Sequence, residues 1–171
     1  MTTINRIFLR LWPYIWQLSF ILVFMTLVLF AFGSLSTSVV LGAIGASSLG
    51  ATCFILFATP QSDTAKVRHV WGGYIIGISA GVLCHYGVSL YADLPHVIEP
   101  MAFHGLCAAF AIVLASIGMA LFRLSHPPAI GMALGLVLEQ WDHWTLIIVF
   151  TAVVILSVTK KLLHGRIKSL A

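Results

Sequence analysis

The chain has 171 residues, of which 60% are hydrophobic and only 8% are charged. This composition excludes a soluble globular domain and is typical of an integral membrane protein. The net charge of +4 is explained by the sidedness of membrane proteins, so we expect no nucleic-acid partner. The length fits a single transmembrane domain over 1–171.

Apolar runs predict an all-α, polytopic membrane fold with about six segments. They cover about 14–32, 38–59, 70–90, 101–122, 127–138 and 145–159. The first four are long enough to span a bilayer, and the fifth is about half that length. The sixth needs Lys160 and Lys161 to extend their charged ends to the surface. A cleaved signal peptide is the alternative for the first segment, which we expect to be retained.

The cations predict the orientation. Threading six crossings puts all nine Lys and Arg residues on one side: Arg6, Arg10, Lys66, Arg68, Arg123, Lys160, Lys161, Arg166 and Lys168. Four acids fall on the other side: Asp93, Glu99, Glu139 and Asp142. Since cytoplasmic loops carry the excess of Lys and Arg, both termini are expected in the cytoplasm. The absence of an Arg- and Ser-rich transit segment favours a bacterial inner membrane.

A weak internal repeat relates the halves 14–90 and 101–163. Each half has a long span, a Gly-rich segment and another long span, and 42–50 resembles 128–135. Three crossings per half would make the repeats inverted, with broken or half-length second helices. The alternative is that Gly-rich apolar segments resemble one another by composition alone.

Glycines recur every four residues at Gly73, Gly77 and Gly81. Such a smooth face predicts close helix packing, and a pore lined by backbone is the alternative.

The segment beginning at Ser125 describes a helix that starts inside the membrane. Pro127 and Pro128 suit first-turn positions, with Ser125 and His126 as candidate caps. Twelve helical residues rise only about 18 Å, so a helix starting at the surface would leave Glu139 in hydrocarbon.

An extended stretch over 124–126 solves this problem of depth. It would reach inward by about 10 Å, start the helix near the midplane and bring Glu139 to the outer interface. The free N–H groups of Ala129 and Ile130 at the positive helix end, with Ser125 and His126 beside them, favour an anion. The alternative is that the two prolines only terminate the preceding helix.

Metal and redox chemistry is not expected. Cys53, Cys84 and Cys107 lie in apolar segments and are unpaired by spacing, and the histidines lack a metal-ligand pattern. We therefore predict no metal site and no cofactor.

Several motifs together resemble the HPP family of integral membrane proteins, which is named for its His-Pro-Pro motif. They are Gly45-Ala46-Ser47-Ser48, Phe57-Ala58-Thr59-Pro60-Gln61-Ser62, Arg68-His69-Val70-Trp71-Gly72-Gly73 and Ser125-His126-Pro127-Pro128-Ala129. The resemblance implies transport, because plastid and cyanobacterial members are associated with nitrite movement. This chain departs from the family pattern with Val67 for proline, Tyr74 for histidine, and Pro-Ala-Ile-Gly in place of Pro-Ala-Gly-Ala.

The sequence and the resemblance together predict transport of a small inorganic anion such as nitrite, by a channel or a proton-linked carrier. The expected site combines Ser125, His126, Pro127, Pro128, Ala129 and Ile130 with Gly45, Ala46, Ser47 and Ser48 of the other half. Arg68 and Arg123 are candidates for a cytoplasmic gate. We also expect a homo-oligomer.

Two other classes of function remain open. An enzyme is not expected, because the neighbouring acids Glu139 and Asp142 suit a solvated cap better than catalysis. A membrane scaffold or assembly subunit would explain the glycine faces without any polar pathway.

Overall fold

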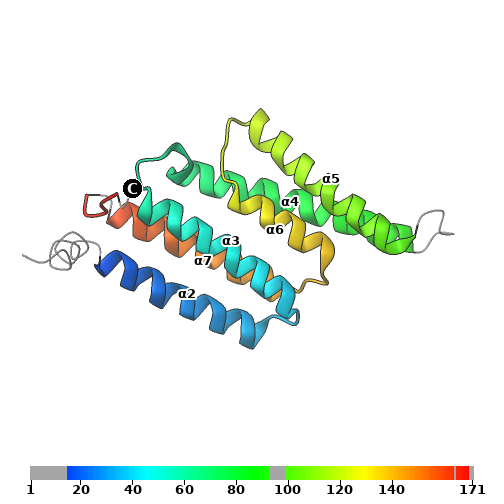
Figure 1. Ribbon diagram of the computed structural model, residues 1–171, viewed down its shortest axis with the longest axis horizontal. Coiled ribbons are helices and arrows are strands. Elements are labelled where there is room, and N and C mark those ends of the chain that lie inside the picture. Colours follow the sequence, from blue (N-terminus) through cyan, green and yellow to red (C-terminus); the bar gives the residue numbers. More distant parts are fainter. Residues whose placement is uncertain (1–14, 93–98, 164, 170–171) are drawn as a thin grey trace, which may run out of the picture.

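In the described part of the chain, six α-helices lie alongside one another and alternate in direction (Figure 1). The computed structural model describes residues 15–92, 99–163 and 165–169. The helices are α2 (Ile15–Leu35), α3 (Val39–Ala58), α4 (Val67–Ala92), α5 (Pro100–Leu121), α6 (Pro128–Leu138) and α7 (His143–Leu162), with the short 3₁₀ turn η2 (Asp63–Ala65) before α4. All except α6 and η2 are long and apolar enough to cross a membrane. The predicted all-α, multi-pass membrane fold is confirmed.

Three helices begin at a polar cap residue. Ser38 Oγ accepts a hydrogen bond from Leu41 N, and a Glu99 carboxylate oxygen accepts one from Ala102 N. Asp142 Oδ1 accepts from Thr145 N at 2.8 Å. Each cap satisfies a first-turn N–H group that would otherwise have no intrahelical partner.

The helices form two groups of three that meet along α3 and α6. One group contains α2, α3 and α7, and the other contains α4, α5 and α6. The two halves of the sequence are α2–α4 and α5–α7. The third helix of the first half, α4, therefore packs in the second group, and the third helix of the second half, α7, packs in the first. Exchanging α2 with α5, α3 with α6, and α4 with α7 reproduces every principal pairing. This pattern matches the predicted inverted repeat at the level of helix neighbours, although the halves 14–90 and 101–163 are not separate packing units.

The second helices of the two halves differ in length, which corrects part of the prediction. Helix α6 has 11 residues, as expected of a half-length helix, but α3 is an unbroken helix of 20 residues. The glycines of α3 make room for a neighbour instead of breaking the helix: a Cβ at Gly45 would lie 2.7 Å from the Phe32 ring of α2. Without a proline inside it, α3 keeps its backbone hydrogen bonds.

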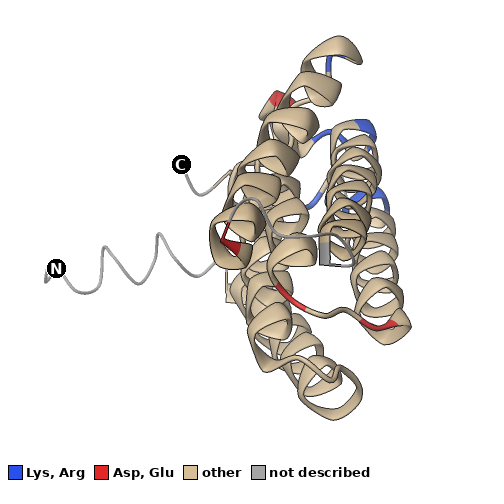
Figure 2. Ribbon diagram, turned by 90° about the vertical axis from the view of Figure 1, so that its right-hand side faces the viewer, with Lys and Arg blue, Asp and Glu red and all other residues tan. Residues whose placement is uncertain are grey.

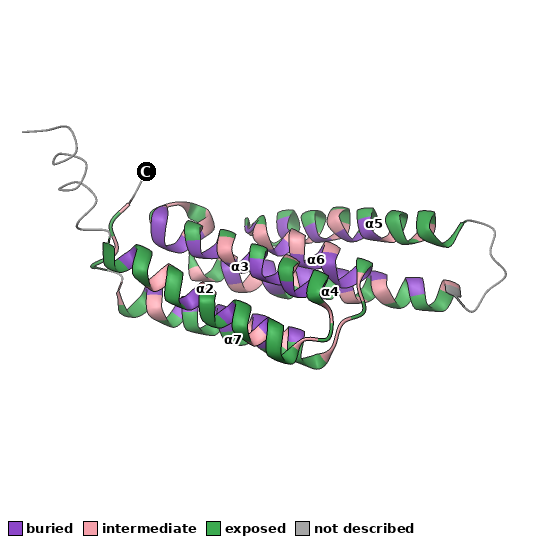
Figure 3. Cartoon of the chain, turned by 60° about the horizontal axis from the view of Figure 1, so that its bottom comes forward, coloured by how far each residue is buried: buried purple, intermediate pink, exposed green. Residues whose placement is uncertain are grey.

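The exterior of the bundle is apolar. Figure 3 shows buried positions on the facing sides of the helices and exposed positions on the outside. The exposed side chains include large apolar ones such as Phe30, which is 72% exposed, Leu22 and Phe110. An outer surface of this kind suits contact with lipid, because a soluble protein rarely exposes apolar patches so extensively.

Charges separate between the two ends of the helices. Figure 2 views the bundle from the end where the α2–α3 and α6–α7 turns lie. Glu99, Glu139 and Asp142 lie at helix boundaries of that end. The described Lys and Arg residues lie at or beyond the opposite helix ends, together with one acid, Asp63, whose carboxylate is 2.7 Å from Lys66 Nζ. The described cations and the acids Glu99, Glu139 and Asp142 lie at the ends predicted for them, while Arg6, Arg10 and Asp93 lie outside the described residues.

Candidate functional site

The connection between α5 and α6 turns into the bundle instead of returning along its surface. Residues 124–126 have no regular secondary structure, and Arg123 has a φ of 52°. Ser125 N donates to His69 Nδ1 at 3.0 Å. A Cβ at Gly73 would lie 2.5 Å from His126 Cβ, so the connection follows the first turns of α4 in close contact. Residues 124–126 therefore lie outside the helices, as the sequence predicted, and they lead from the end of α5 to a buried His126.

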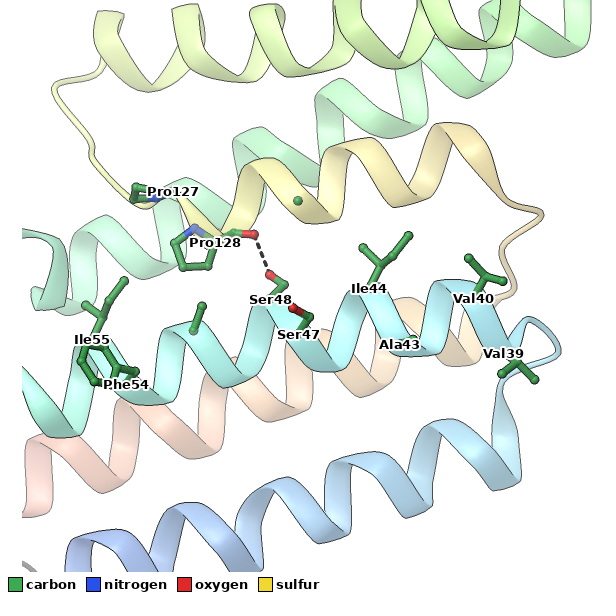
Figure 4. Close-up of a pocket in the computed structure, with 12 residues that line it drawn as sticks. Val39, Val40, Ala43, Ile44, Ser47, Ser48, Phe54, Ile55, Pro127 and Pro128 are labelled. Carbon is green, nitrogen blue, oxygen red and sulfur yellow. Dashed lines mark hydrogen bonds between the residues drawn. The ribbon is translucent and has the colours of Figure 1, made fainter. Parts of the chain in front are cut away.

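Helix α6 begins beside the middle of α3. Ser48, near the centre of α3, donates from its hydroxyl to Pro128 O at 2.7 Å, the bond drawn in Figure 4. At the other end of α6, Glu139 accepts a hydrogen bond from Ser38, which caps the start of α3. Helix α6 therefore covers only half of α3, and Glu139 reaches the end of the bundle as predicted.

A chain of buried hydrogen bonds joins the connection to α3 and α4. His126 Nε2 lies 3.0 Å from Thr52 Oγ1, and Thr52 Oγ1 lies 3.0 Å from Tyr74 Oη. Tyr74 Oη is 2.9 Å from Ser48 Oγ, whose proton goes to the Pro128 carbonyl. His126, Thr52 and Tyr74 are fully buried. Leaving buried polar groups without hydrogen bonds costs free energy, so this series of hydrogen bonds fixes where α6 begins.

One atom of this cluster remains unsatisfied. Among the described residues, His126 Nδ1 is buried and makes no hydrogen bond of ordinary geometry, and the Thr64 backbone lies close to this imidazole. A buried polar atom without a partner in an otherwise satisfied cluster is a functional candidate.

The first-turn amides of α6 are occupied. Ala129 N donates to His126 O at 3.1 Å, and Ile130 N donates to Pro127 O at 3.0 Å. The cap position belongs to Pro127 and has no side-chain cap bond, so neither Ser125 nor His126 caps the helix. These amides are not free donors in this conformation, and only the positive end of the α6 dipole remains available to an anion.

The predicted residues of α3 divide between three environments. Ser48 faces the start of α6, as described above. Gly45 faces Phe32 of α2, and Ala46 is buried in the apolar core. Ser47 is exposed and lines an apolar groove of about 970 Å³ between α3 and the start of α6 (Figure 4). Gly45 and Ala46 are therefore not brought together with Ser125 and His126.

A smaller cavity lies on the α5 side of the connection. It measures about 200 Å³ and is lined by Ser116, Met119, Ala120, Leu124, Ser125, His126, Pro127 and Ile130. Ser125 is exposed. The cavity is therefore lined both by the accessible Ser125 hydroxyl and by His126, whose side chain is buried.

The two arginines predicted as a gate lie at the start of the connection. Arg68 Nη2 donates to Phe122 O at 3.2 Å, and the side chain of Arg123 is exposed. Both are at the cation-rich end, where an anion approaching the small cavity would first meet positive charge.

Tyr74 and His69 contribute to this site but were not predicted from the sequence as site residues. Tyr74 was noted only as a departure from a family pattern, and His69 accepts the Ser125 amide although nothing in its spacing indicates this. The available signal was chemical: a tyrosine in a tightly packed helix face needs a partner for its hydroxyl. Within the described ranges, no three His, Cys, Asp or Glu side chains gather as a metal site would require.

Comparison with known proteins gives one match. The family described as HPP, transmembrane region, matches residues 9–168. No curated protein and no solved structure matches the chain.

Proposed function

We propose, from the premise that this chain belongs to the HPP family of membrane proteins, that it transports a small monovalent anion such as nitrite. The observation that carries the proposal is the half-length helix α6, whose start lies beside the middle of α3 with a buried histidine preceding it. Interrupted helices in membrane proteins gather at substrate sites, because irregular backbone at that depth needs protein or water around it.

The donor set favours an anion held by side chains. The amides of Ala129 and Ile130 are engaged, so the proposed ligands are the Ser125 hydroxyl and the N–H group of the His126 imidazole. The positive end of α6 and the nearby Arg123 add favourable potential. Among the described residues, the acids with one exception lie at the far end of the helices, which leaves this region without competing negative charge.

Passage beyond the cavity requires a movement of helices. On the far side, α4 and α6 are in contact: a Cβ at Gly77 would lie 2.4 Å from Ala129 O, and one at Gly81 would lie 2.7 Å from Ala133 O. The proposed site is therefore accessible from the cation-rich end and closed toward the other. Separation of α6 from α4 would open it, either as a channel gate or as one step of a proton-linked carrier.

We further propose that the cation-rich end faces the cytoplasm of a bacterial cell, with the protein in the inner membrane. The excess of Lys and Arg at this end supports the orientation. The cavity at Ser125 would then be open to the cytoplasm.

The test is nitrite influx into proteoliposomes, with chloride, nitrate and formate as comparison anions and a pH gradient imposed or omitted. We expect selective nitrite flux that falls at least tenfold in Ser125→Ala and His126→Gln. Ser89→Ala and His104→Ala are matched controls, because both residues are exposed on α4 and α5 away from the cavity. A flux that responds to the gradient supports a carrier.

Two results would contradict the proposal. Unchanged nitrite flux in both folded site variants would remove this site. An absence of flux for all four anions from folded protein would remove anion transport and favour the membrane-scaffold alternative.

A further inference from the structure

We propose a second site, for the phosphate headgroup of an anionic phospholipid, at the cation-rich end of the molecule. A cavity of about 480 Å³ lies there between the α3–α4 loop and the end of α7. Its lining residues are Pro60, Gln61, Ser62, Lys66, Val67, Lys160 and Lys161. None of them contributes to the cavity at Ser125, so this inference does not depend on the transport proposal.

Three ammonium groups line the cavity, and each is held differently. Lys160 is 92% buried, and its Nζ donates to Ala65 O and, at 3.3 Å, to Pro60 O, which fixes the loop against α7. Lys66 pairs with Asp63 at 2.7 Å. Lys161 is exposed and has no ion-pair partner among the described residues.

The local charge favours an anion. Three lysines and one carboxylate leave a net charge of +2 around the cavity. The Asp63 carboxylate is occupied by Lys66, and that contact lowers the pKa of Asp63 below its ordinary value, so the carboxylate stays ionised at neutral pH. The Lys161 ammonium therefore remains available to a phosphate.

The location favours a lipid as the source of the phosphate. Helix α3 ends at Ala58, α4 begins at Val67 and α7 ends at Leu162, so the cavity lies where three helices leave the bilayer. Phospholipid headgroups are concentrated at this depth, and basic pockets between transmembrane helices are suited to them. The acyl chains of the lipid would follow the apolar outer surface of the same helices.

The test uses the full chain in detergent micelles and measures thermal unfolding while phosphatidylglycerol, phosphatidylcholine or inorganic phosphate is titrated. We expect saturable stabilisation by phosphatidylglycerol, little by the other two, and an apparent affinity about fivefold weaker in Lys161→Gln. Arg166→Gln is the matched control, because it removes one exposed cation from the same end without changing the cavity lining.

Each of three other outcomes would overturn the proposal. Equal stabilisation by phosphatidylcholine would indicate a general lipid effect. Equal weakening in both variants would indicate attraction to the whole cation-rich surface rather than to this cavity. Equal stabilisation by inorganic phosphate would assign the cavity to a free anion instead of a lipid.

Discussion

Single buried hydroxyl groups determine where the half-length helix begins. Ser48 and Thr52 lie one turn apart on α3, and together they contact Tyr74, His126 and the Pro128 carbonyl. A helix that starts inside a membrane exposes backbone groups that water cannot satisfy, so these side chains supply the missing partners. Two hydroxyl groups on α3 thus stabilise the start of α6, which lies 80 residues after Ser48 in the sequence.

The Thr52 hydroxyl can be tested by a substitution that keeps the shape of the side chain. Thr52→Val would leave His126 Nε2 buried without a partner, so we expect a loss of about 1–3 kcal/mol in the free energy of unfolding. Thr26→Val is the control, because Thr26 is exposed on α2 and bonds only the carbonyl one turn earlier. Unfolding in detergent micelles measures both, and an equal loss in the two variants would show that the buried contact is unimportant.

Asp142 links the α6–α7 turn to the α2–α3 turn. Its carboxylate accepts hydrogen bonds from Thr145 N and Thr37 N, each at 2.8 Å. Burial alone would raise the pKa of Asp142, but the bonds from Thr145 and Thr37 outweigh it and lower the pKa below its ordinary value.

This lowered pKa predicts a loss of stability in acid. The contribution of Asp142 is complete above the unfolded-state pKa of about 4 and disappears as the pH falls through the lower folded-state value. At neutral pH we expect Asp142→Ala to be about 1 kcal/mol less stable than the wild type. The difference should shrink below pH 4 in unfolding curves measured across pH, and a constant difference would argue against a role of the charge.

At the scale of the helices, the contact between α4 and α6 decides the architecture. A Cβ at Gly77 or Gly81 would overlap atoms of α6, and a Cβ at Gly73 would overlap His126 in the connection that precedes α6. Four-residue spacing of glycines predicted such a face from the sequence alone. It did not identify the partner, because any helix with small residues could approach a glycine face.

Two glycine substitutions, one inside this contact and one outside it, test how tightly the helices pack. Gly77→Ala would place a Cβ 2.4 Å from the Ala129 carbonyl oxygen, whereas a Cβ at Gly131 would meet nothing within 4 Å. We expect Gly77→Ala to cost about 1–3 kcal/mol in unfolding free energy. Gly131→Ala should be neutral or stabilising by up to about 1 kcal/mol, because alanine favours helix more than glycine does. Equal changes in unfolding free energy for the two variants would mean that α4 and α6 do not pack closely at Gly77.

The whole molecule is organised by two features of the sequence, the apolar segments and the position of the charges. The described cations lie at one end of the helices, and all described acids except Asp63 lie at the other. Moving several Lys and Arg side chains across hydrocarbon is costly, so this separation favours helices that cross between the two charged ends.

Labelling of single cysteines tests the orientation. In a chain whose native Cys53, Cys84 and Cys107 are replaced by alanine, Gln61→Cys should react only with a reagent on the cytoplasmic side. Gln140→Cys should react only from the outside. Both positions are exposed and lie at opposite ends of the bundle. The reverse pattern would invert the proposed orientation, and reaction of both from one side would contradict the six-segment topology.

The sequence by itself determined the membrane class, the six apolar segments, the separation of charge and the half-length helix that starts at depth. These depend on hydropathy, helix rise and proline chemistry, which act locally along the chain. Only the tertiary structure decided that α3 is continuous, that Thr52, Tyr74 and His126 form one cluster, and that the amides of Ala129 and Ile130 are occupied. Those outcomes depend on which helices become neighbours, since a hydroxyl on α3 meets an imidazole 74 residues away only after α3, α4 and α6 have packed together.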